Sequence, residues 1–163
     1  MVIKAKIIWG GKEHSIEYHD ADSFLELPAD KITQAYGVCF VDDKIVIGLR
    51  GAKQTWGIIG GTVEPGETPE QTLIREVQEE SNMRVLKYLP LGYQIVTRPD
   101  GSINYQLRYC CMVQPIGNFV SDPAGSIVEI KLVNPADYKE YFDWGEVGDR
   151  IIARALELKL KII

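Results

Sequence analysis

Short stretches rich in apolar and β-branched residues alternate along the chain with clusters of turn-forming residues, which is the pattern of strands. Two such stretches open the sequence, Ile3 to Trp9 and Ser15 to Tyr18, and Gly10-Gly11-Lys12 between them is typical of a hairpin turn. Further strands are predicted over residues 35–41, 45–49, 86–97, 102–113 and 127–133. We therefore predict an N-terminal β-ribbon over residues 1–34, followed by a sheet built from the later strands.

Two segments have helical rather than strand signals. Asp149 to Leu160 carries apolar residues at the spacing of one helix face, which predicts a C-terminal helix. In the middle of the chain, Thr68 is a predicted N-cap, Pro69 suits the first helical position, and Gln71 can close a capping box. This second helix is predicted from about Pro69 to Ser81. Strands on both sides of a central helix, with another helix at the end, predict a mixed sheet between helices.

Composition and charge restrict the classes of function. The chain has 163 residues, 45% of them apolar and 25% charged, which suits one ordinary globular domain. No apolar run approaches the roughly 20 residues that cross a bilayer, and the N-terminus lacks the features of a signal peptide, so we expect a cytoplasmic protein that does not enter membranes. The formal charge of −5 disfavours a nucleic-acid polymer as substrate, whereas bound metal ions could still reverse the local field for a small nucleotide.

The central helix and the segment before it contain the candidate chemistry. Residues 57–66 hold four glycines and a proline and are predicted to be a loop. Three apolar residues share one arc of the helix and are predicted to face the core: Leu73, Ile74 and Val77. Three carboxylates fall on the neighbouring flank, which is predicted to be exposed: Glu76, Glu79 and Glu80. A divalent cation would convert their repulsion into binding, but the helix taken alone favours an ordinary solvated acidic face.

The residues that flank this helix reverse that preference. Gly61, five residues, Glu67, seven residues and then the run REVQEESNM over residues 75–83 resemble the Nudix box. The family's pattern is glycine, five residues, glutamate, seven residues and Arg-Glu-U-x-Glu-Glu-x-Gly-U, where U is a bulky apolar residue. Asn82 stands where the family usually has glycine, and Ile59 replaces a proline that is frequent before the box. Because Asn tolerates the left-handed conformation that ends many helices, we expect an intact metal site.

The resemblance implies a fold and an activity. The implied fold is the α+β class, a Nudix-type α/β/α sandwich with a mixed sheet plus the N-terminal β-ribbon. It implies a single domain over residues 1–163, with the box and its preceding loop at 56–83. The implied activity is a hydrolase dependent on Mg²⁺ or Mn²⁺ that cleaves a pyrophosphate bond in a nucleoside diphosphate linked to another moiety. Water would attack phosphorus, the substrate would be small and nucleotide-like, and a homodimer is left open.

The resemblance also implies roles for individual residues. It implies metal ligands at the carbonyl of Gly60 and at the carboxylates of Glu76, Glu79 and Glu80. Glu67 and Arg75 are expected to orient those carboxylates, while the general base is left open among the glutamates. Glu129 is a candidate for a further metal ligand, with an exposed strand residue as an equal alternative. Arg50 is a candidate phosphate-binding residue or a solvated loop charge, and Trp56 either stacks on a base or packs under the loop, with packing favoured.

A second hypothesis is a Nudix fold that binds a nucleotide as a sensing or regulatory module without catalysis. Such modules usually lose glutamates of the box, whereas Glu67, Glu76, Glu79 and Glu80 are all present in this chain. The retained carboxylates therefore favour an enzyme.

Overall fold

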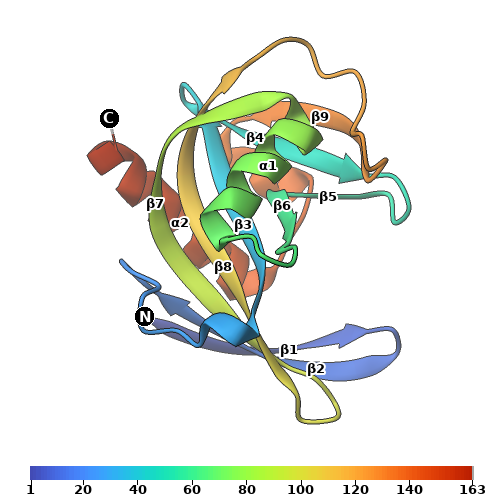
Figure 1. Cartoon of the computed structure of the whole chain (residues 1–163), viewed down its shortest axis with the longest axis vertical. Coiled ribbons are helices and arrows are strands. Elements are labelled where there is room, and N and C mark those ends of the chain that lie inside the picture. The colour runs from blue at the N-terminus through green and yellow to red at the C-terminus, as the bar shows by residue number, and fades with distance from the viewer. Residues whose placement is uncertain (163) are drawn as a thin grey trace.

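The computed structural model describes residues 1–162, which form one nine-stranded sheet with helices on both faces (Figure 1). The strands are β1 (Val2–Trp9), β2 (Lys12–Asp20), β3 (Ile32–Val41), β4 (Lys44–Arg50), β5 (Thr55–Gly57), β6 (Ile59–Thr62), β7 (Met83–Thr97), β8 (Ile103–Pro115) and β9 (Ile127–Val133). The α-helices are α1 (Pro69–Ser81) and α2 (Gly145–Ile162), and the 3-10 helices are η1 (Ala29–Lys31) and η2 (Pro135–Glu140). The predicted succession of strands, a central helix and a C-terminal helix is therefore confirmed.

The sheet is mixed, as predicted. Its order is β1-β2-β7-β8-β3-β4-β5, with β6 paired to β3 and β9 paired to β4. The central strands β3 and β8 run parallel, and the other strand pairs are antiparallel. Neither α1 nor α2 is long and apolar enough to span a membrane.

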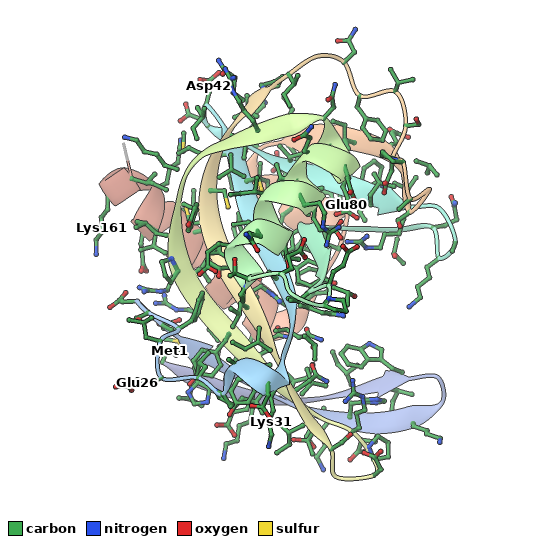
Figure 2. The ribbon with its side chains drawn as sticks, in the orientation of Figure 1. Met1, Glu26, Lys31, Asp42, Glu80 and Lys161 are labelled. Carbon is green, nitrogen blue, oxygen red and sulfur yellow. The ribbon has the colours of Figure 1, made fainter. Side chains whose placement is uncertain are left out.

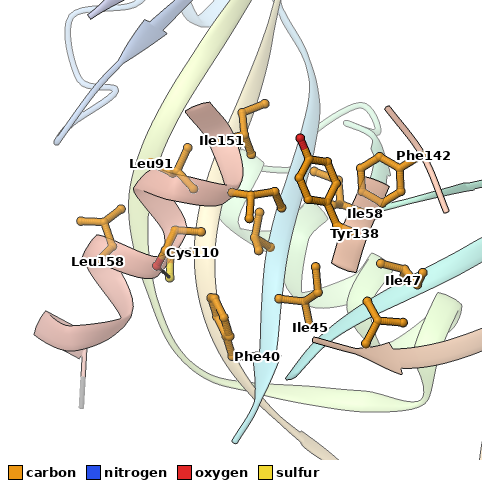
Figure 3. Packing of buried hydrophobic residues seen from close by; sticks show 14 of the residues in the cluster. Phe40, Ile45, Ile47, Ile58, Leu91, Cys110, Tyr138, Phe142, Ile151 and Leu158 are labelled. Atoms are coloured by element: carbon orange, nitrogen blue, oxygen red, sulfur yellow. Dashed lines mark hydrogen bonds between the residues drawn. The ribbon is translucent and has the colours of Figure 1, made fainter. Parts of the chain in front are cut away.

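Two hydrophobic clusters separate the sheet from its helices, because neighbouring residues on a strand point to opposite faces. On β3, Cys39 packs in the cluster under α1, whereas Phe40 packs in the cluster under α2. Figure 3 shows the α2-side cluster, in which Ile151 and Leu158 of α2 pack with Leu91 of β7 and Cys110 of β8. The layers are therefore helix, sheet and helix, which is the α/β/α sandwich.

The N-terminal ribbon extends the main sheet. Residues 15–20 of β2 pair with residues 92–97 of β7, so β1 becomes an edge strand. Gly10 and Gly11 take positive φ angles of 58° and 75° in the predicted hairpin turn, as the tight turn between twisted strands requires. Arg150 of α2 also pairs with Asp20 at 2.7 Å, which ties the ribbon to the far helix. Because β3 begins at Ile32, the last residues of the predicted 1–34 extension belong to the main sheet.

The prediction that residues 57–66 form a loop is wrong in part. Residues 59–62 form β6, which pairs with β3 so that Gly60 lies opposite Tyr36. The strands approach closely there, because a Cβ on Gly60 would lie 2.5 Å from the Tyr36 Cα. Clustered glycines are a signal of a loop, whereas here Gly60 allows the close approach of two backbones.

Candidate active site

Helix α1 begins and ends at the predicted residues. The Gln71 N–H donates to the Thr68 hydroxyl at 3.2 Å, and the Thr68 N–H donates to Gln71 Oε1 at 2.9 Å, which completes the capping box. Asn82 ends the helix with φ 53° and ψ 44°, the left-handed conformation expected of it. These ends fix which residues of α1 face the sheet and which face solvent.

The predicted apolar face of α1 needs one correction. Leu73 and Val77 are buried as expected, but Ile74 is 45% exposed. Thr72 is buried instead, and its hydroxyl donates to Glu67 and to the Thr68 carbonyl. The buried face of α1 is therefore rotated toward the glycine-rich strand β6, away from the face that the helical wheel predicts. The reason is that β6 packs against α1, and a helical wheel contains no information on such a neighbour.

Glu80 is buried, so its predicted position on an exposed flank is wrong. Its side chain lies between α1 and the sheet, with 2% of the residue exposed (Figure 2). The Gly60 N–H donates to Glu80 Oε1 at 2.9 Å, and Arg50 donates to Glu80 Oε2 at 3.0 Å. Burial raises the pKa of Glu80 to about 7, although Arg50 and the Gly60 N–H favour the charged form. The physical reason for the correction is β6, which covers this part of the helix.

Arg75 gathers the other carboxylates of the box. Its Nη1 atom donates to Glu76 at 2.9 Å and to Glu79 at 3.3 Å. Its Nε and Nη2 atoms donate to the two oxygens of Glu67 at 2.8 and 3.0 Å. The hydrogen bonds from Arg75 lower the pKa of Glu67 to about 2, although burial opposes them. Arg75 therefore joins Glu67 to Glu76 and Glu79 through hydrogen bonds, while the orienting role expected of Glu67 and Arg75 stays a prediction.

Glu76 occupies space that only a glycine leaves free. A Cβ on Gly61 would lie 2.5 Å from Glu76 Oε1 and 2.7 Å from its carboxyl carbon. Burial raises the pKa of Glu76 above its ordinary value, Arg75 lowers it, and the charges of Glu79 and Asp122 raise it further. Negative charge is thus concentrated in a partly desolvated place, where a cation would stabilise it.

The donor set fits a divalent metal ion, although its carboxylates are divided between two arginines. Within residues 1–162 no three histidine, cysteine, aspartate or glutamate side chains are grouped as they would be around one ion. Glu80 turns toward Arg50, while Glu76 and Glu79 turn toward Arg75. Carboxylate oxygens are the ligands that Mg²⁺ prefers, so the two guanidinium groups supply positive charge that a metal ion could replace.

Arg50 contacts this centre, whereas Trp56 does not. Arg50 closes β4 and is held against the box by Glu80 and by the Ile58 carbonyl, to which it donates at 3.3 Å. Trp56 is partly buried, with its ring edge-on to Tyr141 at 5.8 Å between centroids, so it packs rather than faces the carboxylates.

Glu129 lies on β9 opposite Leu49 and is exposed. Its neighbour Ile130 packs against the α1-side cluster, so Glu129 points to the other face of the sheet. The structure places Gly60 and Arg50 against Glu80, and it joins Glu67, Glu76 and Glu79 through Arg75. It leaves Glu129 apart from both sets.

Asp122 is a nearby acid that the sequence analysis did not select. It is 6% exposed and accepts hydrogen bonds from the Ala124 and Ile127 N–H groups at 2.9 and 3.1 Å. Its charge contributes to the raised pKa of Glu76. The run Asp122-Pro123-Ala124-Gly125 has the composition of a turn, which would have indicated its local role but not its proximity to α1.

Comparison with known proteins identifies the family. The NUDIX domain family model matches residues 31–155, which is most of the chain. The chain belongs to the Nudix family. The Nudix match leaves residues 1–30, including β1 and β2, outside it.

Individual relatives agree with this assignment. The chain is 30% identical over 112 residues to MutT4 of Mycobacterium tuberculosis (strain CDC 1551 / Oshkosh), an alignment that covers 63% of this chain. It spans only 44% of the length of that relative. The pyrophosphohydrolase BsRppH of Bacillus subtilis superposes with a TM-score of 0.69 and 17% identity, over 91% of this chain and 94% of that one. An Ap4A hydrolase of C. elegans superposes with a TM-score of 0.57 and 17% identity, over 80% and 98% of the two chains. These superpositions confirm the Nudix fold.

Proposed function

We propose that this protein is a metal-dependent hydrolase that cleaves a phosphoanhydride bond in a small nucleotide-like substrate. The observation that carries the proposal is the position of Glu76 and Glu80 against β6, with Glu79 joined to Glu76 through Arg75. Arg50 and Arg75 are the only cationic hydrogen-bond partners of these three carboxylates among the described residues. Glu67 and Gly61 support the arrangement from outside, as a binding site rather than a solvated surface would require. The pyrophosphohydrolase and the Ap4A hydrolase of the same fold act on bonds of this class.

The metal ion, Mg²⁺ or Mn²⁺, would be held by the three carboxylates of α1, with the carbonyl of Gly60 as a further ligand. When bound, such an ion activates water and neutralises charge on phosphate oxygens. The protein's own part is to keep the carboxylates in place: Arg75 orients Glu76 and Glu79, and the Gly60 N–H orients Glu80.

Arg50 has a second task in this proposal. Its guanidinium now holds Glu80, and a planar guanidinium pairs well with phosphate oxygens. The Arg50 side chain, at the end of β4, is 29% exposed to solvent. With Glu80 as a ligand of the metal ion, the Arg50 guanidinium would be available to bind the substrate diphosphate.

The test is a hydrolysis assay on a panel of nucleoside triphosphates, dinucleoside polyphosphates and nucleotide sugars, with Mg²⁺, with Mn²⁺ and with a chelator. We expect turnover that requires the cation. Glu79→Gln should lower the rate by about a hundredfold, the scale of losing a group that stabilises charge in the transition state. Glu157→Gln, which changes an exposed acid on α2, is the matched control and should leave the rate unchanged.

The same panel also defines the outcome that would contradict hydrolysis. If no panel member is hydrolysed with either cation, but one of them binds and raises the melting temperature, the proposal is wrong. The protein would then be a nucleotide-sensing module of the Nudix fold.

A further inference from the structure

Asn82, the one departure from the family's box pattern, makes a side-chain hydrogen bond that glycine could not make. Its side-chain Nδ2 donates to the Asn118 carbonyl at 3.0 Å, while its own carbonyl accepts from the Ile116 N–H at 2.9 Å. Gly117 lies between these two partners, and a Cβ there would lie 3.4 Å from Asn82 Nδ2. Asn82 therefore ends α1 and also holds the start of the segment 116–126, which follows β8.

The segment 116–126 forms one wall of a groove along α1. The groove has a volume of about 630 Å³, and its opposite wall includes Gln71, Ile74 and Gln78 of α1. Val120 lines the groove and is 88% exposed. Along the chain it lies between Asn118, which is bonded to Asn82, and the turn that begins at Asp122. Because Val120 is hardly buried, the hydrogen bonds at Asn118 and at Asp122 hold this wall in position.

The groove is continuous with the carboxylate centre, because Arg75 and Glu79 line it as well. The rest of its lining is uncharged and includes the amides of Gln71 and Gln78 and the apolar side chains of Ile74 and Val120. Amides recognise hydrogen-bonding edges, and apolar side chains cover the faces of rings. This uncharged lining thus suits an uncharged ring-containing group, such as a nucleoside.

We propose that Asn82 is a positioning residue for the substrate. Through the Asn118 carbonyl it fixes the outer wall of the groove, and the groove binds the nucleoside that is attached to the diphosphate. The inference rests on the proposed function for the location of the diphosphate, since the groove begins at the carboxylates of α1.

Two variants isolate the side-chain hydrogen bond. Asn82→Gly and Asn82→Asp both keep a residue that tolerates the left-handed conformation, and both remove the N–H donor to Asn118. The matched control is Arg84→Ala. Arg84 donates to Gln114 at 2.6 Å across β7 and β8, two residues from Asn82, and it does not line the groove.

The first measurement is amide hydrogen exchange over the segment 116–126. Exchange of the Ile116 N–H, which donates to the Asn82 carbonyl, should become about tenfold faster in both Asn82 variants once the neighbouring side-chain hydrogen bond is lost, while α1 and the control variant stay as in the wild type. Unchanged exchange in Asn82→Gly would show that the side chain does not hold the segment, and would overturn the proposal.

The second measurement is calorimetric titration with ADP and with inorganic pyrophosphate, both with Mg²⁺ present. In both Asn82 variants the Kd of ADP should rise about tenfold, while the Kd of pyrophosphate should not change, because the hydrogen bond supports only the nucleoside part. If the wild type binds ADP no more tightly than pyrophosphate, or if both ligands weaken equally, the groove is not a nucleoside site. These titrations need no turnover, so a protein that binds ADP in this way but hydrolyses nothing would refute the proposed function and support the role of Asn82.

Discussion

The raised pKa of Glu80 makes a quantitative prediction about stability without metal. Burial raises that pKa from its ordinary value of 4.5 to about 7 in the folded protein. The folded state therefore holds a proton that the unfolded state has already released. The stability contributed by protonated Glu80 is present below pH 4.5 and is lost as the pH rises through 7. A shift of this size corresponds to about 3 kcal/mol.

Glu80→Gln removes this dependence, because glutamine has a similar shape and no charge at any pH. Other titrating groups are the same in both proteins and cancel in the difference. From about pH 5 to about pH 8, the free energy of unfolding of the wild type should fall relative to that of the variant by about 2 to 3 kcal/mol. The unfolded state releases part of its protons below pH 5, so the change is slightly less than the full shift.

The assay is urea unfolding of both proteins in the presence of a chelator, at several pH values. Adding Mg²⁺ at the highest pH should stabilise the wild type and leave Glu80→Gln nearly unchanged, because the cation replaces the proton as the partner of Glu80. If the stabilities of the two proteins change in parallel with pH, Glu80 does not titrate in this range. The description of Glu80 as a buried carboxyl group that is protonated near neutral pH without metal would then be wrong.

Three further substitutions test the geometry of the centre through kcat/KM and thermal unfolding. Gly61→Ala should lower the rate about tenfold with little loss of stability, because its methyl group meets only the end of the Glu76 side chain and no backbone; a normal rate would contradict this position of Glu76. Gly60→Ala should instead cost about 3 kcal/mol of stability, because its methyl group meets the Tyr36 backbone; an unchanged melting temperature would contradict the β3–β6 pairing. Arg75→Lys keeps the charge but loses the fork that joins the carboxylates, so the rate should fall at least about tenfold, and wild-type activity would rule out the orienting role.

The features that depend on local sequence were predictable. Thr68, Pro69 and Gln71 determine where α1 begins, and Asn82 determines where it ends, through contacts among residues close in the chain. The box pattern likewise placed Arg75 beside Glu67, and the structure joins them by two hydrogen bonds.

The features that depend on distant segments were not predictable. The burial of Glu80 is caused by β6, and the pairing of β6 with β3 depends on a close approach at Gly60 and Tyr36. A helical wheel describes directions around one helix and contains no information on which direction another strand covers. The same limit explains the exposed Ile74 and the proximity of Asp122 to α1.

The most direct test of the central claim is hydrolysis in water labelled with heavy oxygen, followed by mass spectrometry of both products. The account predicts that the reaction requires Mg²⁺ or Mn²⁺ and that the label appears on a phosphate group of one product, because water attacks phosphorus. A reaction that proceeds fully in chelator, or a label found on the carbon skeleton instead of phosphate, would contradict a metal-dependent phosphoanhydride hydrolase built on the carboxylates of α1.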